Sequence, residues 1–225
     1  MAFKEELFPA LCDKVRGILD TLPHCHGLDH TLRVWNVAMH IAEKEGGELW
    51  TVAYGAMLHD IGRASELDGN GSRCHAAVGA EKAADVMREI GVSDECFVKN
   101  VQECVRTHRY RNRAGEPPAS LEAKIVFDAD KLDSMGAIGI GRAFHFAGRI
   151  GARVHNTKTA ALNADSYSSE DTAWREYLVK QQYLHEAMLT TEGKRLAEER
   201  HDFMRQFFSR LNLEVNGETD AILNH

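Results

Sequence analysis

Histidine and aspartate residues recur along this 225-residue chain near the ends of apolar segments. The run AMLHDIGR, residues 56–63, finishes on His59 and Asp60, two polar groups that are costly to bury without partners. Similar placements are found for His30, His75, His108 and Asp130. Imidazole and carboxylate groups together bind Mn, Fe, Co, Ni or Zn ions and leave positions open for water or substrate. The pattern favours a metal site, with helix caps and hydrogen-bonded core residues as the structural alternative.

A metal at such a site would support hydrolysis. A bound divalent ion lowers the pKa of its water from about 15.7 towards about 7, which makes hydroxide available as a nucleophile. Neighbours such as His59 and Asp60 splay by about 100° on a helix, so they converge on one ion only where the helix ends. Gly62, two residues later, allows the backbone to bend there at low cost.

Helices must position these residues, because apolar side chains recur at helical spacing through most of the chain. Gly46-Gly47 and Gly91 are typical of helix ends. Pro117 and Pro118 predict a loop at 111–120, residues 149–168 look irregular, and Ser168 with Asp171 has capping-box spacing. The expected helical segments are 3–22, 28–45, 48–58, 75–90, 94–106, 121–148, 170–189 and 191–211. With no clear strand pattern, we predict one all-α domain.

Composition narrows the class of protein. The net charge of −7 argues against a protein that coats nucleic acid. The five cysteines are odd in number and irregularly spaced, which is typical of reduced thiols in a cytoplasmic protein. No apolar run reaches the length of a membrane span, and the N-terminus does not read as a signal peptide. We expect a cytoplasmic protein without a membrane partner.

Several ordered motifs together resemble a known family. They are HGLDHTLRVWNVA, AMLHDIGR, HAAVGAEKA, VRTHRYR and DADKLDSMGAIGIGRAF. They are similar to the small bacterial and archaeal group of the HD-domain superfamily of metal-dependent phosphohydrolases. The resemblance covers about residues 24–150, and RLAEERHDFMRQFF is similar to the closing helix of that group. It implies a single HD domain over 1–225, with helices at 170–211 packed on this core. The polar composition of the tail at 212–225 predicts that it is frayed.

The resemblance also implies roles for particular residues. The ligands of a central divalent transition metal (Mn, Ni, Fe, Co or Zn, with Mg as a further option) would be His30, His59, Asp60 and Asp130. The same resemblance gives His75 and His108 a second metal, a substrate phosphate or a supporting role. Some relatives place a catalytic glutamate three residues after the HD aspartate, where this chain has Arg63. The proton-transfer group is therefore unassigned, with Glu66 and Asp68 as weak candidates.

Cations near these ligands would hold a phosphate. Arg33 shares a helix face with His30, and Lys131 follows Asp130, so the candidate catalytic residues are Asp60, Arg33 and Lys131. His26 could face the same cleft or cap the start of the helix, and His155 lies in the irregular segment. For the remaining cations, plain solvation of a charged loop is the favoured explanation: Arg109, Arg111, Arg113 and Lys158.

The leading function is hydrolysis of a small phosphorylated compound, most plausibly a nucleotide. A (deoxy)nucleoside triphosphate that releases pyrophosphate is the best substrate guess, and it rests on the resemblance. The alternatives are a di-iron oxygenase of the HD type, which the same six-residue order resembles, and a non-catalytic sensor of metal or nucleotide. The sequence leaves open whether the protein is a monomer or a homodimer.

Overall fold

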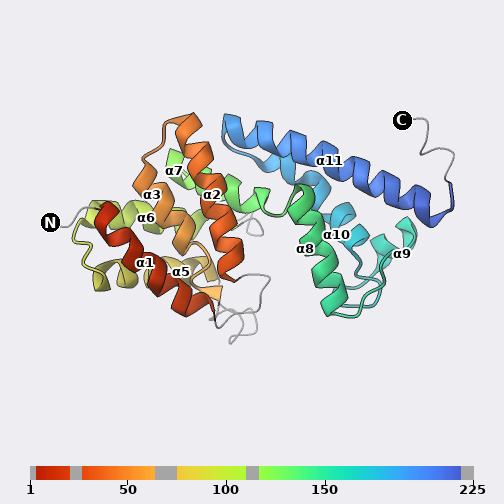
Figure 1. The fold of residues 1–225 in the computed structure, drawn as a ribbon, viewed down its shortest axis with the longest axis horizontal. Helices are drawn as coiled ribbons and strands as arrows, with labels where there is room; N and C mark the ends of the chain where they lie inside the picture. Colours follow the sequence, from red (N-terminus) through yellow and green to blue (C-terminus); the bar gives the residue numbers. More distant parts are fainter. Residues whose placement is uncertain (1–3, 21–26, 64–74, 110–116, 219–225) are drawn as a thin grey trace. The chain divides into compact units, whose positions relative to one another are not determined.

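The structure is a computed structural model that describes residues 4–20, 27–63, 75–109 and 117–218 (Figure 1). Helices are its regular secondary structure, and the described ranges contain no strand. The all-α prediction is confirmed. No helix in these ranges has the length and apolar content needed to cross a membrane.

The chain is divided into two compact units. The first comprises Met1–Lys131 and Leu189–Gly193, and the second comprises Leu132–Met188 and Lys194–His225. That residues 1–225 form one domain, with the 170–211 helices on its core, stays a prediction.

The helices of the first unit are α1 (Lys4–Leu19), α2 (Leu28–Glu45), α3 (Leu49–Leu58), α5 (His75–Glu89), α6 (Glu95–Thr107) and α7 (Leu121–Leu132). All but α7 lie close to the predicted segments. The segment predicted to be helical over 121–148 is two helices, because α7 ends at Leu132 and the next helix begins at Gly136. Gly46 ends α2 with a φ of +81°, and Gly91 follows α5 with a φ of +98°. These left-handed conformations explain why glycine stands at both positions. The loop predicted at 111–120 lies mostly outside the described residues.

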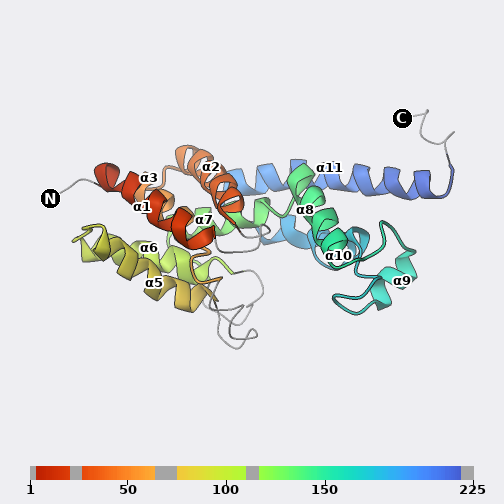
Figure 2. The same ribbon diagram turned by 60° about the horizontal axis from the view of Figure 1, so that its bottom comes forward.

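A continuous apolar core forms between α1, α3, α5 and α6, and α5 lies side by side with α6 (Figure 2). Helix α3 is its centre, since eight of its ten residues are buried, as the sequence predicts. Side chains that fill this core include Leu11, Val15, Tyr54, Met57, Leu58, Met87, Phe97, Val98 and Val101. Burial of each large apolar side chain contributes about 1.5–3 kcal/mol. This rigid packing fixes the ends of α3, α5 and α6, where the candidate ligands lie.

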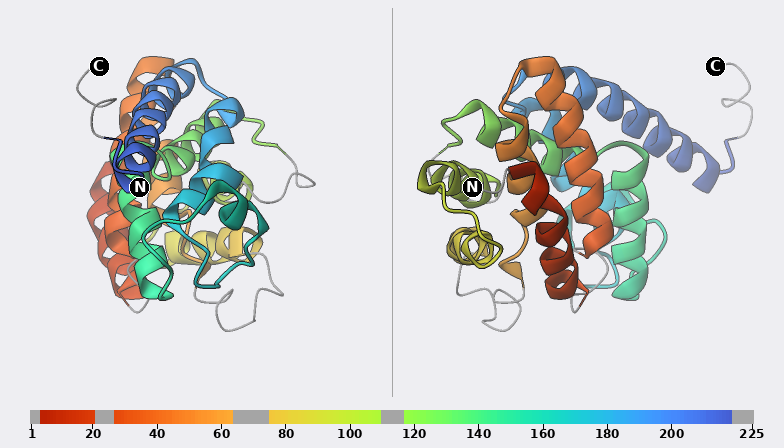
Figure 3. Two further views of the ribbon diagram at one scale, coloured as in Figure 1. Left: turned by 90° about the vertical axis from the view of Figure 1, so that its right-hand side faces the viewer. Right: turned by 60° about the vertical axis from the view of Figure 1, so that its left-hand side comes forward.

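The second unit departs more from the predicted segments. Its helices are α8 (Gly136–Arg149), α9 (Lys158–Asn163), α10 (Ala173–Val179), the 3-10 helix η2 (Gln181–Ala187) and most of α11 (Thr191–Val215). Helix α9 forms within the segment predicted to be irregular, and it packs on α10 (Figure 3). The single helix predicted over 170–189 is instead α10 followed by η2.

Two predicted ends in this unit were wrong. The side chain that caps α10 is Thr172, whose Oγ1 accepts a hydrogen bond from the Arg175 amide at 3.1 Å. Ser168 and Asp171 form no capping box, because the Asp171 carboxylate accepts from the Tyr167 amide instead. Helix α11 continues to Val215, so the start of the predicted frayed tail is helical. Residues 219–225 lie outside the described ranges.

Candidate metal centre

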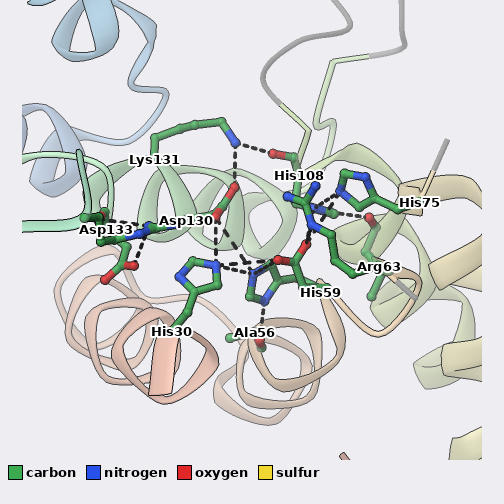
Figure 4. Close-up of polar contacts among 12 residues, drawn as sticks. His30, Ala56, His59, Arg63, His75, His108, Asp130, Lys131 and Asp133 are labelled. Carbon is green, nitrogen blue, oxygen red and sulfur yellow. Dashed lines mark hydrogen bonds and ion pairs between the residues drawn. The ribbon is translucent and has the colours of Figure 1, made fainter. Parts of the chain in front are cut away.

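Six predicted site residues meet at one place in the first unit, and the close-up in Figure 4 labels five of them. They come from different elements, but each stands at or near a helix end. His30 lies in the first turn of α2, His59 caps the C-terminus of α3, Asp60 follows it, His75 begins α5, His108 caps α6, and Asp130 is in the last turn of α7. All but Asp130 are at most 1% exposed as whole residues, and the Asp130 side chain is 19% exposed.

Four of these side chains form a first cluster. The Nε2 atoms of His30 and His59 lie 3.2 Å apart. Oδ2 of Asp60 lies 3.7 Å from Nε2 of His30, and Oδ1 of Asp130 lies 3.5 Å from the same nitrogen. From Nε2 of His59, each of these two oxygens is 3.8 Å away. The side chains predicted to ligate a metal are therefore gathered around a common point.

This spacing fits a bound transition-metal ion. Ligand atoms about 2.1 Å from a metal in tetrahedral or octahedral arrangement lie about 3.0–3.4 Å from one another. The observed separations are equal to or slightly longer than this, so a small inward movement of the carboxylates would complete the set. Histidine nitrogens and carboxylate oxygens are also the donor types that Mn, Fe, Co, Ni and Zn accept.

Backbone hydrogen bonds orient two of the imidazoles. Nδ1 of His59 donates to the carbonyl of Ala56 at 2.7 Å, and Nδ1 of His108 donates to the carbonyl of Val105 at 2.6 Å. Because Nδ1 carries the proton, the Nε2 lone pair of each ring points into the site. Burial lowers the pKa of His59 to about 4, although Asp60 and Asp130 act to raise it. His59 is therefore a neutral donor at physiological pH, the form that binds metals.

A second cluster shares one carboxylate with the first. Oδ1 of Asp60 lies 3.5 Å from Nε2 of His75 and 3.5 Å from Nε2 of His108. The two histidine nitrogens are 3.3 Å apart. Each of two sets of side chains has donor atoms close enough together to hold an ion of its own. The sets are His30, His59 and Asp60, and Asp60, His75 and His108. Asp60 thus presents one oxygen to each cluster, which is the geometry of a bridging carboxylate.

Arg63 contacts this bridging residue. Its Nε donates to Oδ1 of Asp60 at 3.0 Å, and its side chain is 24% exposed. The sequence identified Arg63 only as a departure from the family pattern. Its ion pair with Asp60 had a sequence signal in the i, i+3 spacing of the two residues, but which carboxylate oxygen it contacts depends on the tertiary structure.

Lys131 joins two parts of the centre. Its Nζ donates to Oδ2 of Asp130 at 2.7 Å and to the backbone carbonyl of His108 at 2.5 Å (Figure 4). The same nitrogen lies over the Phe127 ring, 4.6 Å from its centroid. Burial acts to raise the pKa of Asp130, but the Lys131 cation and His30 hold that pKa well below its ordinary value. Asp130 is therefore an ionised carboxylate whose Oδ1 faces the histidines of the first cluster.

Gly62 positions the second cluster through close backbone contact. A Cβ atom at Gly62 would lie 2.2 Å from the carbonyl oxygen of His75 and 2.7 Å from the backbone nitrogen of Gly79. The sequence predicts a low-cost backbone bend at Gly62, but the φ of this residue is not positive. Glycine is needed at position 62 because α5 packs directly against the turn that carries His59 and Asp60 and leaves no room for a side chain.

The neighbouring Asp128 has a different task from Asp130. Its carboxylate accepts hydrogen bonds from the amides of Leu189 and Thr190 and from the Thr190 hydroxyl. Burial raises its pKa, and these hydrogen bonds counter that effect. Asp128 therefore anchors the segment 189–193 within the first unit. The sequence did not distinguish this role, because the two aspartates stand two positions apart on one helix.

The structure describes some of the other candidate residues. Arg33, one turn after His30, donates to Oδ2 of Asp29 at 2.9 Å. His155 belongs to the second unit, where its ring bonds to Asn212, and Lys158 begins α9. Arg109 directly follows His108. The candidates outside the described residues are His26, Glu66, Asp68, Arg111 and Arg113.

Comparison with known proteins gives consistent results. Residues 27–135 match the sequence model of the HD domain. YpgQ of Bacillus subtilis (strain 168), a protein described as uncharacterized, is 32% identical over 204 residues, which are 90% of this chain and 91% of YpgQ. A crystal structure of YpgQ in complex with ADP has a TM-score of 0.71 and 26% identity, covering 94% of this chain and 96% of that one. An HD-superfamily hydrolase from Bacillus thuringiensis has a TM-score of 0.73 and 28% identity, covering 95% and 99%.

Proposed function

Because this chain belongs to the HD-domain superfamily, we propose that it is a metal-dependent hydrolase that cleaves a phosphate ester or anhydride of a nucleotide. One observation carries the proposal: imidazoles and carboxylates at or near the ends of α2, α3, α5, α6 and α7, and in the turn after α3, converge with the spacing of metal ligands. Three buried ligand-type groups, His30, His59 and Asp60, with the partly buried Asp130 beside them, would be costly to keep together for structural reasons alone. The ligands of the first ion are His30, His59, Asp60 and Asp130.

The chemistry divides between the ion and the chain. When bound, a divalent ion polarises a phosphoryl oxygen and lowers the pKa of a coordinated water. Asp60 and Asp130 supply the negative charge that holds this ion, and His59 supplies a neutral donor with a fixed tautomer. Arg33 is the candidate that neutralises charge on the substrate phosphate. Its exposed pair with Asp29 is worth about 0–1 kcal/mol, so a phosphate can replace the carboxylate.

A nucleotide is the substrate class we propose. The YpgQ complex with ADP supports it, because that relative covers nearly the whole of this chain. Within this class, a (deoxy)nucleoside triphosphate is the best candidate. The oxygen of water would bond to the α-phosphorus, the bond between that phosphorus and the α–β bridging oxygen would break, and pyrophosphate would leave with that oxygen.

A release assay tests this function. The purified chain, loaded in turn with Mn, Ni, Co or Mg, is mixed with the common ribo- and deoxyribonucleoside mono-, di- and triphosphates. Phosphate and pyrophosphate are then measured separately. We expect pyrophosphate from at least one triphosphate with a transition metal. Failure to cleave any ester or anhydride with any metal would reject the hydrolase and favour a sensor of metal or nucleotide.

A di-iron oxygenase is the second candidate, and the shared carboxylate of Asp60 is the observation that favours it. Two clusters joined by one aspartate could hold two irons near each other. Purification with two irons, a coloured mixed-valent centre and consumption of O₂ would support this reading. Turnover of a nucleotide with Mn, without O₂, would reject it.

Lys131 positions ligands in this proposal, since the residue is only 5% exposed and its amine is directed to Asp130 and the His108 carbonyl. We expect Lys131→Met to weaken Mn²⁺ binding by about 10–100-fold, as loss of a partner that orients a ligand does. Isothermal titration calorimetry measures the affinity. Lys180→Met, which removes a lysine paired with Glu176 far along the sequence, is the control. Unchanged Mn²⁺ affinity in Lys131→Met would contradict the positioning role.

A further inference from the structure

The two clusters differ in the charge that faces them. The first contains carboxylate oxygens of both Asp60 and Asp130, together with two histidines. Among the residues that the structure describes, the second has one carboxylate oxygen, Oδ1 of Asp60, beside His75 and His108, and the guanidinium of Arg63 donates to that same oxygen at 3.0 Å. From these residues a second divalent ion meets less negative charge than the first, and a cation already pairs with the carboxylate that would bind it.

The positive charge at this position is permanent. An arginine guanidinium does not lose its proton in proteins, so Arg63 cannot become neutral to admit a metal. It is also held near Asp60 by the backbone, because the Arg63 amide donates to the Asp60 carbonyl at 3.0 Å. Its side chain is nevertheless 24% exposed, whereas that of Asp60 is 1% exposed. The guanidinium can turn towards solvent, but Asp60 cannot.

We propose that Arg63 controls how many metal ions the centre holds. The first cluster binds its ion tightly, and the second cluster binds weakly because its ion must displace the Arg63 guanidinium from Oδ1 of Asp60. The affinity of the second cluster for a divalent cation is therefore set by a residue that is not itself a ligand. This inference rests on the metal centre of the proposed function and adds the order and strength of ion binding.

Titration with Mn²⁺ alone tests the inference on the full-length, metal-free protein. Calorimetry gives the two affinities, and electron paramagnetic resonance distinguishes an isolated Mn²⁺ from a spin-coupled pair. In the unmodified protein we expect the second ion to bind at least about 100-fold more weakly than the first. Arg63→Gln removes the charge, so the second affinity should rise about tenfold or more, while the first changes less than threefold.

Two further variants separate charge from structure. Arg63→Lys keeps the cation and should keep the weak second affinity. Arg88→Gln is the matched control, because Arg88 also pairs with an aspartate three residues before it, at an exposed position on α5. It should leave both affinities unchanged.

The failures are distinguishable. Equal affinities for the two ions in the unmodified protein would overturn the inference without any variant. A second affinity that is the same in Arg63→Gln as in Arg63→Lys would overturn it too, and both results leave the first ion and the proposed hydrolase intact. Absence of all Mn²⁺ binding would overturn both this inference and the proposed metal centre.

Discussion

Asp60→Ala is expected to abolish binding at both clusters, because this one carboxylate gives Oδ2 to the first and Oδ1 to the second. Loss of a group that only supports a ligand costs about 10–100-fold in metal affinity, so loss of a shared ligand should cost more than about 100-fold at the first cluster. Activity that depends on the metal should disappear with it. Metal analysis of the purified variant and Mn²⁺ calorimetry measure the effect.

Two controls make the Asp60→Ala result specific. Circular dichroism shows whether the metal-free variant keeps its helical content, and Asp60→Asn keeps the volume of the side chain while removing its charge. Asp202→Ala removes an exposed aspartate that also precedes its partner arginine by three residues. That variant should bind Mn²⁺ normally. Full metal occupancy in folded Asp60→Ala would show that Asp60 is not a metal ligand.

Gly62→Ala is expected to destabilise the protein strongly. The added Cβ would lie 2.2 Å from the carbonyl oxygen of His75 and 2.9 Å from Cα of Gly79, and these backbone atoms can move only if α5 moves. Overpacking of this kind costs about 1–3 kcal/mol and occasionally more. Movement of α5 would also carry His75 away from Asp60, so binding of a second ion should weaken as stability falls.

Denaturant unfolding and Mn²⁺ titration test Gly62→Ala together. Gly17→Ala in the same unit is the control, since a Cβ there would meet no atom within 4 Å. Gly17 lies inside α1, where alanine is favoured over glycine by about 0.5–1 kcal/mol, so this variant should be slightly more stable. If Gly62→Ala unfolds at the same denaturant concentration as the unmodified protein, the packing argument is incorrect.

The two-cluster arrangement bears on the choice between functions. A hydrolase needs one ion to activate water, whereas the oxygenase alternative needs two irons at once. A cation paired with Asp60, the carboxylate that the described residues offer to the second cluster, disfavours a permanently occupied pair of irons. The ion pair of Arg63 with Asp60 therefore supports the hydrolase over the oxygenase, and the Mn²⁺ stoichiometry bears on both proposals.

The sequence by itself predicted the residues that meet at the centre and most helices of the first unit. Helical periodicity and helix-ending glycines are local signals, and they placed α2, α3, α5 and α6 to within a residue or two. His59 and Asp60 were recognisable because polar groups at the end of an apolar helix need partners. The second unit was less predictable, since α9 and η2 are short and have weak periodicity, and Thr172 rather than Ser168 caps α10.

Only the tertiary structure decided what each polar atom contacts. That Asp60 divides its oxygens between two clusters depends on the first residue of α5, His75, and the C-cap of α6, His108, lying beside the turn after α3. Lys131 looked like a phosphate ligand from its place after Asp130, yet its amine lies on Asp130 and on a carbonyl from another helix. The contact between Lys131 and the His108 carbonyl joins residues far apart in the chain. Composition and sequence spacing do not tell how close two such residues lie in space. The sequence thus determined which residue types form the centre, and the packing of the helices determined which carboxylate oxygens and cations face each cluster.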